Sequence, residues 1–363
     1  MQARIQKIDF LPDRRIICVS DIHTELALFK RLLAKINYSE DDYLFIVGDF
    51  LERGSGSSLE TLHYFMDLSK KKNVHVVLGN SDDVWYMMSR TIRPDLYIEY
   101  LLDDRNSLVK ELCRKINLQV NFDSDCYKIA DILKEHFPKE WEFLTNLPHI
   151  IESEDYLFVH GGINPNKEGF CDDPYQLMKC DNFEGRGFYF DKYVIVGHWP
   201  VSNYAKEIIS FNPRINEKQR IISIDGGNVL KSSGQLNALI IENGRFSSAY
   251  VDNLPQIIVT EAYLSKDSYS PISVSWRDSQ VEVLEHLGEF SNVRHLTSGH
   301  EFKVLARNLY QENGKTYCSD ATTNHLKAYE GEKLGLVYYG SRYSLAKKEG
   351  ILGWIKNSCF KLE

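Results

Sequence analysis

The first eighty residues alternate between short apolar runs and amphipathic segments. The runs 15–20, 43–48 and 74–79 are rich in β-branched residues and predict buried strands. Between them, 24–37 and 58–72 carry apolar residues at helical spacing. Strand–helix–strand units form parallel sheets with the helices outside, so this pattern predicts an α/β fold. In such sheets functional groups gather beyond the carboxyl ends of the strands.

Residues 82–147 are polar, aromatic-rich and mostly helical in pattern. Because this segment follows a strand end directly, we expect a helical cap insertion beside any site formed there. Trp85, Met87 and Met88 allow two interpretations, since they could line a cleft or pack in the core of the insertion. After the insertion, further strands are expected at 156–159, 193–196, 221–224, 236–242 and 246–251.

The pattern changes again after residue 253, where helical periodicity fades and short strands are separated by small polar residues. We therefore predict a main domain over residues 1–253 and a small all-β C-terminal domain over 256–363. The segment 331–355 reads as a small antiparallel barrel. It resembles bacterial SH3-type modules, which commonly close with a Gly-x-x-Gly-Trp strand, here residues 350–354. Such a domain is expected to bind a protein or peptide partner.

Charge and cysteine content narrow the class of protein. The chain has 363 residues and a net charge of −8, which argues against nucleic acid as a partner, because phosphate backbones are bound through a basic surplus. The seven cysteines include no Cys-x-x-Cys pair, which favours reduced thiols. No apolar stretch approaches the ~18–20 residues of a membrane span, and the N-terminus lacks a signal-peptide core. We expect a cytoplasmic protein without a membrane partner.

Five short segments each end an apolar run with a side chain that suits a metal ion. They are Val-Ser-Asp-Ile-His at 19–23, Val-Gly-Asp-Phe-Leu-Glu-Arg-Gly at 47–54, Leu-Gly-Asn-Ser-Asp at 78–82, Val-His-Gly-Gly at 159–162 and Val-Gly-His-Trp-Pro at 196–200. Carboxylate, amide and imidazole groups are the ligands of hard or borderline divalent ions, and no thiolate occurs among them. Together the segments predict one metal site.

The spacing suggests how two ions could be shared. Asp21 and His23, two residues apart at a strand end, could reach one ion, and Asp49 could bridge it to a second. The second ion would be completed by three further ligands: Asn80, His160 and His198. Two ions ~3.5–4 Å apart can share a hydroxide and polarise the phosphoryl group that it attacks in line.

Other polar residues near these segments have more than one interpretation. Arg53 could offer a bidentate guanidinium to a phosphate. Arg186 could be a second phosphate clamp, although a turn residue is the simpler account. Asp225 is expected to be a turn carboxylate that orients a ligand loop. The histidines of the tail show no ligand spacing and are expected to be structural: His286, His295, His300 and His325.

The five segments resemble the calcineurin-like metallophosphoesterase superfamily, whose motifs are Asp-x-His, Gly-Asp-x-x-x-Arg-Gly, Gly-Asn-His-Asp/Glu, His-Gly-Gly and a late Gly-His. The similarity covers roughly residues 14–252, and 53–54, 160–162 and 224–227 are most similar to the serine/threonine phosphoprotein phosphatase branch. The resemblance implies two packed mixed β-sheets flanked by helices and hydrolysis of phosphate esters at a dinuclear Mn, Fe or Zn centre, with Mn preferred. It implies the same ligands, with Arg53 as phosphate binder: Asp21, His23, Asp49, Asn80, His160 and His198.

Three positions depart from that branch. Thr24 follows Asp-Ile-His where the branch usually has glycine, and Glu52 replaces its usual aspartate. Ser81 stands where the branch has the histidine thought to protonate the leaving oxygen. A proton would then have to come from elsewhere, for example from Asp82 through water, so Arg53, Ser81 and Asp82 are the expected catalytic positions.

The sequence is compatible with three functions. The first is a phosphomonoesterase resembling serine/threonine protein phosphatases. The second is a phosphodiesterase or dinucleoside-polyphosphate hydrolase, and the third is a catalytically weak binding or scaffold protein. The expected substrate is accordingly a phosphoprotein, a nucleotide or a small phosphoester.

Overall fold

The computed structural model describes residues 3–11, 14–264 and 270–363, and the chain divides into two compact units. The first unit consists of Met1–Trp199, Pro213–Leu230 and Leu236–Val251. The second consists of Pro200–Asn212, Lys231–Gln235 and Asp252–Glu363. The second unit thus includes two short segments from the middle of the chain. The domain boundaries expected at residues 253 and 256 stay a prediction.

The first unit contains two mixed β-sheets. One has five strands in the order β11-β10-β2-β3-β4, and the other has six in the order β1-β5-β6-β7-β9-β8. The five-stranded sheet is built from β2 (Ile16–Val19), β3 (Tyr43–Val47), β4 (Val74–Val77), β10 (Leu236–Glu242) and β11 (Arg245–Val251). The six-stranded sheet is built from β1 (Ile5–Lys7), β5 (Ile150–Glu152), β6 (Tyr156–Val159), β7 (Tyr193–Val196), β8 (Arg214–Asn216) and β9 (Ile221–Ser223).

The strands that precede the five segments with potential metal ligands are parallel within each sheet. β2 pairs in parallel with β3 and β3 with β4, and in the other sheet β6 pairs in parallel with β7. The predicted α/β fold of two packed mixed sheets is therefore confirmed. Because carboxyl ends of parallel strands meet at one edge, each sheet brings its own segments together.

A shared apolar core lies between the two sheets. In β3, Tyr43, Phe45 and Val47 point into this core, and the alternate residues Leu44 and Ile46 face the helices. This alternation explains why β3 is apolar without interruption, since both of its faces are buried. The ring of Phe45 stacks on that of Phe158 from the other sheet, with centroids 3.8 Å apart.

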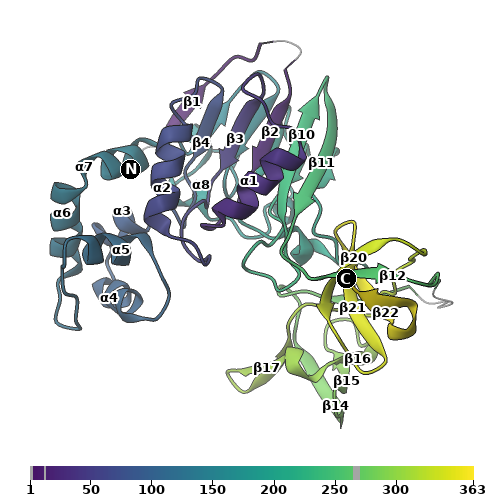
Figure 1. Ribbon diagram of the computed structural model, residues 1–363. Helices are drawn as coiled ribbons and strands as arrows, with labels where there is room; N and C mark the ends of the chain where they lie inside the picture. Colours follow the sequence, from purple (N-terminus) through teal and green to yellow (C-terminus); the bar gives the residue numbers. More distant parts are fainter. Residues whose placement is uncertain (1–2, 12–13, 265–269) are drawn as a thin grey trace. The chain divides into compact units, whose positions relative to one another are not determined.

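Helices α1 (Leu26–Lys35) and α2 (Ser58–Leu68) pack on the outer face of the five-stranded sheet (Figure 1). Both are shorter than the segments predicted from periodicity. α1 begins only at Leu26, after His23 and Thr24 have taken positive φ values of 49° and 62° that a helix cannot contain. The other sheet is covered by a third apolar cluster that includes residues near α8 (Tyr175–Met178).

The helical insertion between β4 and β5 contains five helices. They are α3 (Val84–Met88), α4 (Pro94–Leu102), α5 (Leu108–Lys115), α6 (Cys126–His136) and α7 (Pro138–Asn146). Trp85 and Met88 are fully buried, and Trp85 meets the ring of Trp141 edge to face at 5.0 Å. Of the two interpretations of these residues, core packing is therefore correct for Trp85 and Met88.

The second unit is almost entirely antiparallel β-structure. Its main sheet has the order β22-β21-β20-β12-β23, beside a three-stranded sheet β14-β15-β16 and the pairs β13-β19 and β17-β18. The main sheet contains β12 (Gln256–Val259), β20 (Lys333–Tyr338), β21 (Tyr343–Lys348), β22 (Ile351–Lys356) and β23 (Phe360–Leu362). The others are β13 (Ser273–Val274), β14 (Val281–Leu287), β15 (Phe290–His295), β16 (Glu301–Leu305), β17 (Leu309–Glu312), β18 (Lys315–Cys318) and β19 (Ala321–Thr322). An all-β C-terminal region was the expectation, and it is confirmed.

Several smaller expectations concern side chains. All seven cysteines are free thiols. His325 hydrogen bonds with the Tyr263 hydroxyl over 2.6 Å, and His295 lies 3.0 Å from the Asp278 carbonyl oxygen, so both have structural partners. Among the described residues, no helix has both the length and the apolar character needed to cross a membrane.

The packing of the two sheets can be tested by truncating its central ring. Phe158→Ala should lower the free energy of unfolding of the first unit by about 3–5 kcal/mol, because a fully buried phenyl group is replaced by a cavity. Denaturant titration measures this loss. Phe122→Ala, at a position 79% exposed, is the matched control and should change stability by at most about 0.5 kcal/mol. Equal effects of the two changes would contradict the described core.

Candidate metal centre

Each predicted ligand follows a strand directly. Asp21 and His23 come after β2, Asp49 after β3 and Asn80 after β4, all in the five-stranded sheet. His160 comes after β6 and His198 after β7, in the six-stranded sheet. The site is therefore assembled from loops at the strand ends of both sheets, as open α/β architecture favours.

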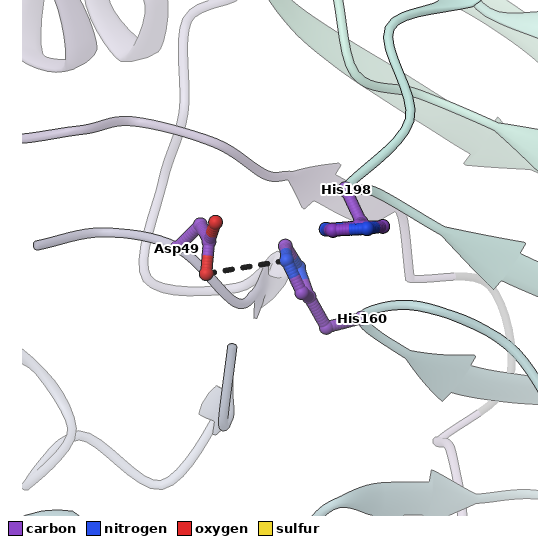
Figure 2. Close-up of side chains that lie close together, drawn as sticks. All are labelled: Asp49, His160 and His198. Atoms are coloured by element: carbon purple, nitrogen blue, oxygen red, sulfur yellow. Dashed lines mark ion pairs between the residues drawn. The ribbon is translucent and has the colours of Figure 1, made fainter. Parts of the chain in front are cut away.

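Two groups of potential ligands share the carboxylate of Asp49. Asp21, His23 and Asp49 form one group, and Asp49, His160 and His198 form the other, each with ligand atoms within 4.8 Å of one another. Figure 2 shows the second group, in which Asp49 Oδ1 lies 3.2 Å from His160 Nε2. In the first group, His23 Nε2 lies 3.9 Å from Asp21 Oδ1 and 4.0 Å from Asp49 Oδ2.

The two separations in the first group fit ligands of a common ion better than hydrogen bonds. A hydrogen bond needs about 3 Å, whereas atoms bound ~2.0–2.2 Å from one ion stand somewhat farther from each other. Asp21 Oδ1 and His23 Nε2 are buried and have no hydrogen-bond partner. A buried polar atom without a partner is costly, so both atoms fit a site that a divalent cation completes.

Backbone carbonyl groups orient two of the rings. His160 Nδ1 lies 2.8 Å from the Val47 oxygen, and His23 Nδ1 lies 3.2 Å from the Leu51 oxygen. A ring that donates its Nδ1–H to a carbonyl keeps the Nε2 lone pair free for a metal. His198 is turned the other way, because its Nε2 lies 3.0 Å from Asp181 Oδ1.

The Asn80 amide faces the remaining nitrogen of His198. With its nitrogen turned that way, the amide donates to His198 Nδ1 over 2.8 Å and to the Met178 carbonyl over 3.3 Å. Rotation of the amide presents its oxygen in the same place. Asn80 Oδ1 and His198 Nδ1 can therefore converge on one cation, as expected for the second ion.

The pKa values show how strongly charge is concentrated here. Burial raises the pKa of Asp21 well above its usual range, and the charge of Asp225 adds to this. Burial also lowers the pKa of His198 to about 4, which keeps this ring neutral. Against the effect of burial, the Asp49 carboxylate raises the pKa of His160 to about 10, and His160 in turn holds the pKa of Asp49 low. Cations would relieve the repulsion among the buried carboxylates.

The backbone around the ligands is strained. Asp21, His23, Asp49 and His198 all have positive φ values between 49° and 64°. For residues other than glycine this conformation costs on the order of 1–3 kcal/mol each and clusters at functional sites. Glycine is required nearby at position 79, where an added Cβ would lie 2.2 Å from the Asp49 nitrogen.

Asp82 holds the turn that carries Asp49. Its carboxylate accepts hydrogen bonds from the backbone nitrogens of Asp49 (2.8 Å), Phe50 (3.0 Å), Leu51 (2.9 Å) and Gly79 (2.9 Å). Both oxygens are thus engaged in a buried position. These contacts support a structural role for Asp82, and the proton transfer expected from the sequence stays a prediction.

Ser81 is also bound to the shared ligand. Its backbone nitrogen donates to Asp49 Oδ1 and its hydroxyl donates to Asp49 Oδ2, each over 2.8 Å. Asp225 accepts a hydrogen bond from the Gly227 nitrogen over 2.7 Å, which agrees with the expected turn carboxylate. Arg186 lies exposed in the short helix η2 (Glu184–Arg186), a turn position.

Arg53 is exposed. Burial lowers the pKa of His23, and the charge of Arg53 adds to this effect. Glu52, one residue earlier, is buried and accepts hydrogen bonds from the Tyr100 hydroxyl and from the Leu108 nitrogen (2.7 Å). Burial raises the pKa of Glu52 to about 7. The sequence singled out Glu52 only as a departure from the family motif, and its partners lie in the helical insertion.

The donor set thus forms two overlapping groups of potential metal ligands. The family model of calcineurin-like phosphoesterases matches residues 14–218, more than half of the chain. The chain therefore belongs to the calcineurin-like phosphoesterase family and is a metal-dependent phosphoesterase.

Among curated proteins no match is found. A provisionally assigned diadenosine tetraphosphatase of known structure is 18% identical, with 69% of this chain and 99% of that chain covered and a TM-score of 0.43. A serine/threonine phosphatase from Saccharomyces cerevisiae is 13% identical, with 70% and 86% covered and a TM-score of 0.42. A cold-active protein-tyrosine phosphatase from a Shewanella species is 15% identical, with 69% and 83% covered and a TM-score of 0.42. Neither a substrate nor a residue role follows from likenesses at this level.

The shared ligand gives the first test of the site. Asp49→Asn should abolish phosphoesterase activity and reduce bound metal below the roughly two ions per chain expected of the parent, because an amide offers one good acceptor oxygen. Elemental analysis and activity with added Mn²⁺ measure both effects. Asp41→Asn is the control, since the Asp41 side chain is 91% exposed. A fully active Asp49→Asn protein would contradict the assignment of Asp49.

A second test separates the two roles of Asp82. Asp82→Asn places an amide nitrogen among backbone N–H donors, so we expect a stability loss on the order of 2–3 kcal/mol and weaker metal binding. Thermal unfolding and metal titration measure these changes, again beside Asp41→Asn. If the variant keeps parental stability and metal affinity and only its pH–rate profile changes, Asp82 transfers protons and the structural assignment fails.

Proposed function

We propose that this chain hydrolyses phosphate esters at a two-metal centre. The proposal depends on one observation above all: the Asp49 carboxylate belongs to both groups of potential ligands. A bridging carboxylate is what a two-ion site requires. The proposed ligands are Asp21, His23, Asp49, Asn80, His160 and His198, with manganese as the preferred metal.

Three residues beside the proposed ligands also contribute to the site. When bound, two divalent ions supply Lewis acidity and a hydroxide nucleophile at neutral pH. Ser81 and Asp82 fix Asp49, the first through its carboxylate and the second through its backbone. Arg53 binds the phosphoryl group with its planar guanidinium, which matches two phosphate oxygens at once.

The contacts of Ser81 and Glu52 favour substrates whose leaving group needs no protonation. Ser81 has no ring to donate a proton, and its hydroxyl is engaged with Asp49. The neighbouring Glu52 carboxylate is engaged with Tyr100 and Leu108. General acid help is typically worth 10²–10⁴-fold, so its absence weighs most on poor leaving groups. Aryl esters, diesters with acidic leaving groups and polyphosphates need it least.

We therefore consider two candidate enzyme functions. A phosphomonoesterase resembling serine/threonine protein phosphatases follows from the sequence motifs. A phosphodiesterase or dinucleoside-polyphosphate hydrolase is favoured by the contacts of Ser81 and Glu52. A catalytically weak scaffold protein is the third candidate, and the concentration of buried, charged ligands weighs against it.

One assay distinguishes these functions. The purified chain with Mn²⁺ is offered an aryl phosphomonoester, an aryl phosphodiester, a phosphoserine peptide and a dinucleoside tetraphosphate. Preferred turnover of the last, or of the diester, selects the second function. Chelated protein is the control for metal dependence, and absence of turnover on all four substrates would favour the scaffold.

The second unit is proposed to bind a protein or peptide partner through the SH3-type module suggested by residues 331–355. Support comes from β20, β21 and β22, which are consecutive antiparallel strands in this segment. A cytoplasmic location remains part of the proposal.

The role of position 81 can be tested by restoring the family's histidine. Ser81→His should raise phosphoserine hydrolysis more than aryl ester hydrolysis, by up to the ~10²–10⁴-fold that general acid catalysis supplies. Ser81→Ala is the matched control, because it removes the hydroxyl bond to Asp49 without adding a ring. Chemical-step rates and metal content are measured for all three proteins. Should the parent cleave phosphoserine and nitrophenyl phosphate at similar chemical-step rates, another residue already supplies the proton.

A further inference from the structure

The loop between β3 and α2 carries Arg53. The start of this loop is hydrogen bonded to the helical insertion. We call residues 52–57 the Arg53 loop. The buried Glu52 carboxylate accepts hydrogen bonds from the Tyr100 hydroxyl in α4 and from the Leu108 nitrogen at the start of α5. Glu52 therefore joins the Arg53 loop to two helices of the insertion.

The other end of the Arg53 loop is held by α5 as well. The Glu111 carboxylate accepts hydrogen bonds from the Ser57 hydroxyl (2.5 Å), the Ser58 nitrogen (2.8 Å) and the Leu59 nitrogen (3.0 Å). Free N–H groups in the first turn of a helix favour such a negative partner. Glu111 thus caps α2, while Glu52 caps α5, and the two anchors enclose Arg53.

The Tyr100 side chain is itself held in place. Lys110 and Arg105 lie over its ring, 5.4 Å and 5.5 Å from the centroid. Lys110 is fixed in turn by the Asp103 carboxylate at 2.6 Å. These contacts hold the Tyr100 ring while its hydroxyl donates to Glu52.

Between these anchors the backbone is strained and Arg53 stays exposed. Glu52 and Arg53 have consecutive positive φ values of 64° and 68°. Non-glycine residues keep this conformation only where surrounding contacts hold them. Glu25 adds one such contact, because its carboxylate accepts from the nitrogen and hydroxyl of Ser55, each over 2.9 Å.

We propose that the helical insertion positions Arg53 for phosphate binding through the Glu52–Tyr100 contact. Glu52 and Tyr100 are positioning residues that act through Arg53 and touch no substrate. This inference rests on the proposed function in one respect, namely that Arg53 binds the phosphoryl group. On this inference, the glutamate that replaces the family's usual aspartate at position 52 serves to position Arg53.

The experiment is a double-mutant cycle with inorganic phosphate as the probe. In the full chain with Mn²⁺, Tyr100→Phe should raise the inhibition constant of phosphate and the KM of an aryl phosphate about 3- to 10-fold, the effect of one lost hydrogen bond. We expect kcat and metal content to stay close to those of the parent. In an Arg53→Ala background the same substitution should change nothing further, because residues that act through one another are not additive.

Two controls test whether the effect is specific to Tyr100 or common to any change in the insertion. Tyr127→Phe removes a hydroxyl from the same insertion, where it donates to the Thr91 carbonyl, and should leave all constants unchanged. Amide hydrogen exchange of the metal-free proteins gives a readout independent of turnover. Tyr100→Phe should speed exchange within the Arg53 loop and at Leu108, and Tyr127→Phe should not. Glu52→Gln provides a second variant with the same expected direction.

The outcomes separate the two proposals. Weaker phosphate binding by Tyr100→Phe that disappears in the Arg53→Ala background supports the inference. If Arg53→Ala weakens phosphate binding and Tyr100→Phe does not, the inference fails and the proposed function stands. An equal effect of Tyr100→Phe with and without Arg53 also overturns it. If Arg53→Ala leaves phosphate binding unchanged, the proposed role of Arg53 fails, and the inference fails with it.

Discussion

The geometry of the site depends on the carboxylate of Asp82. Four backbone N–H groups converge on it, and three of them belong to Asp49, Phe50 and Leu51. This contact keeps the turn in a conformation that isolated residues would avoid, and so directs the Asp49 side chain at both groups of ligands. A short hydrogen-bonded turn thus holds a rarely populated backbone conformation and a buried carboxylate in one place.

The central fold could be predicted from sequence because its signals are local. The continuous apolar runs of β2, β3 and β4 and the helical spacing of α1 and α2 identify a parallel sheet without knowledge of any partner. Strand ends then indicate where the ligands gather. The short strand β1 was not anticipated. β1 has three residues, all exposed, so no apolar pattern marks it, and its pairing partner β5 lies far along the chain.

The chemistry of single positions was less predictable, for a physical reason. Glu52 and Ser81 were visible as departures from a motif, yet their roles depend on what they contact. Glu52 meets Tyr100 and Leu108, which are 48 and 56 residues away in sequence. The four backbone N–H groups that Asp82 contacts could likewise not be read from its neighbours in sequence. In the same way, composition alone did not indicate that segments 200–212 and 231–235 belong to the second compact unit.

The division of the ligands between two sheets has a thermodynamic consequence. Asp21, His23, Asp49 and Asn80 follow strands of one sheet, whereas His160 and His198 follow strands of the other. An ion held by Asp49 and His160 together is a cross-link between the two layers that Phe45 and Phe158 also join. Ligands that bind only the folded state add stability, about 2.7 kcal/mol at a free concentration one hundred times the dissociation constant. The free energy of unfolding of the first unit is therefore expected to rise with the supply of metal.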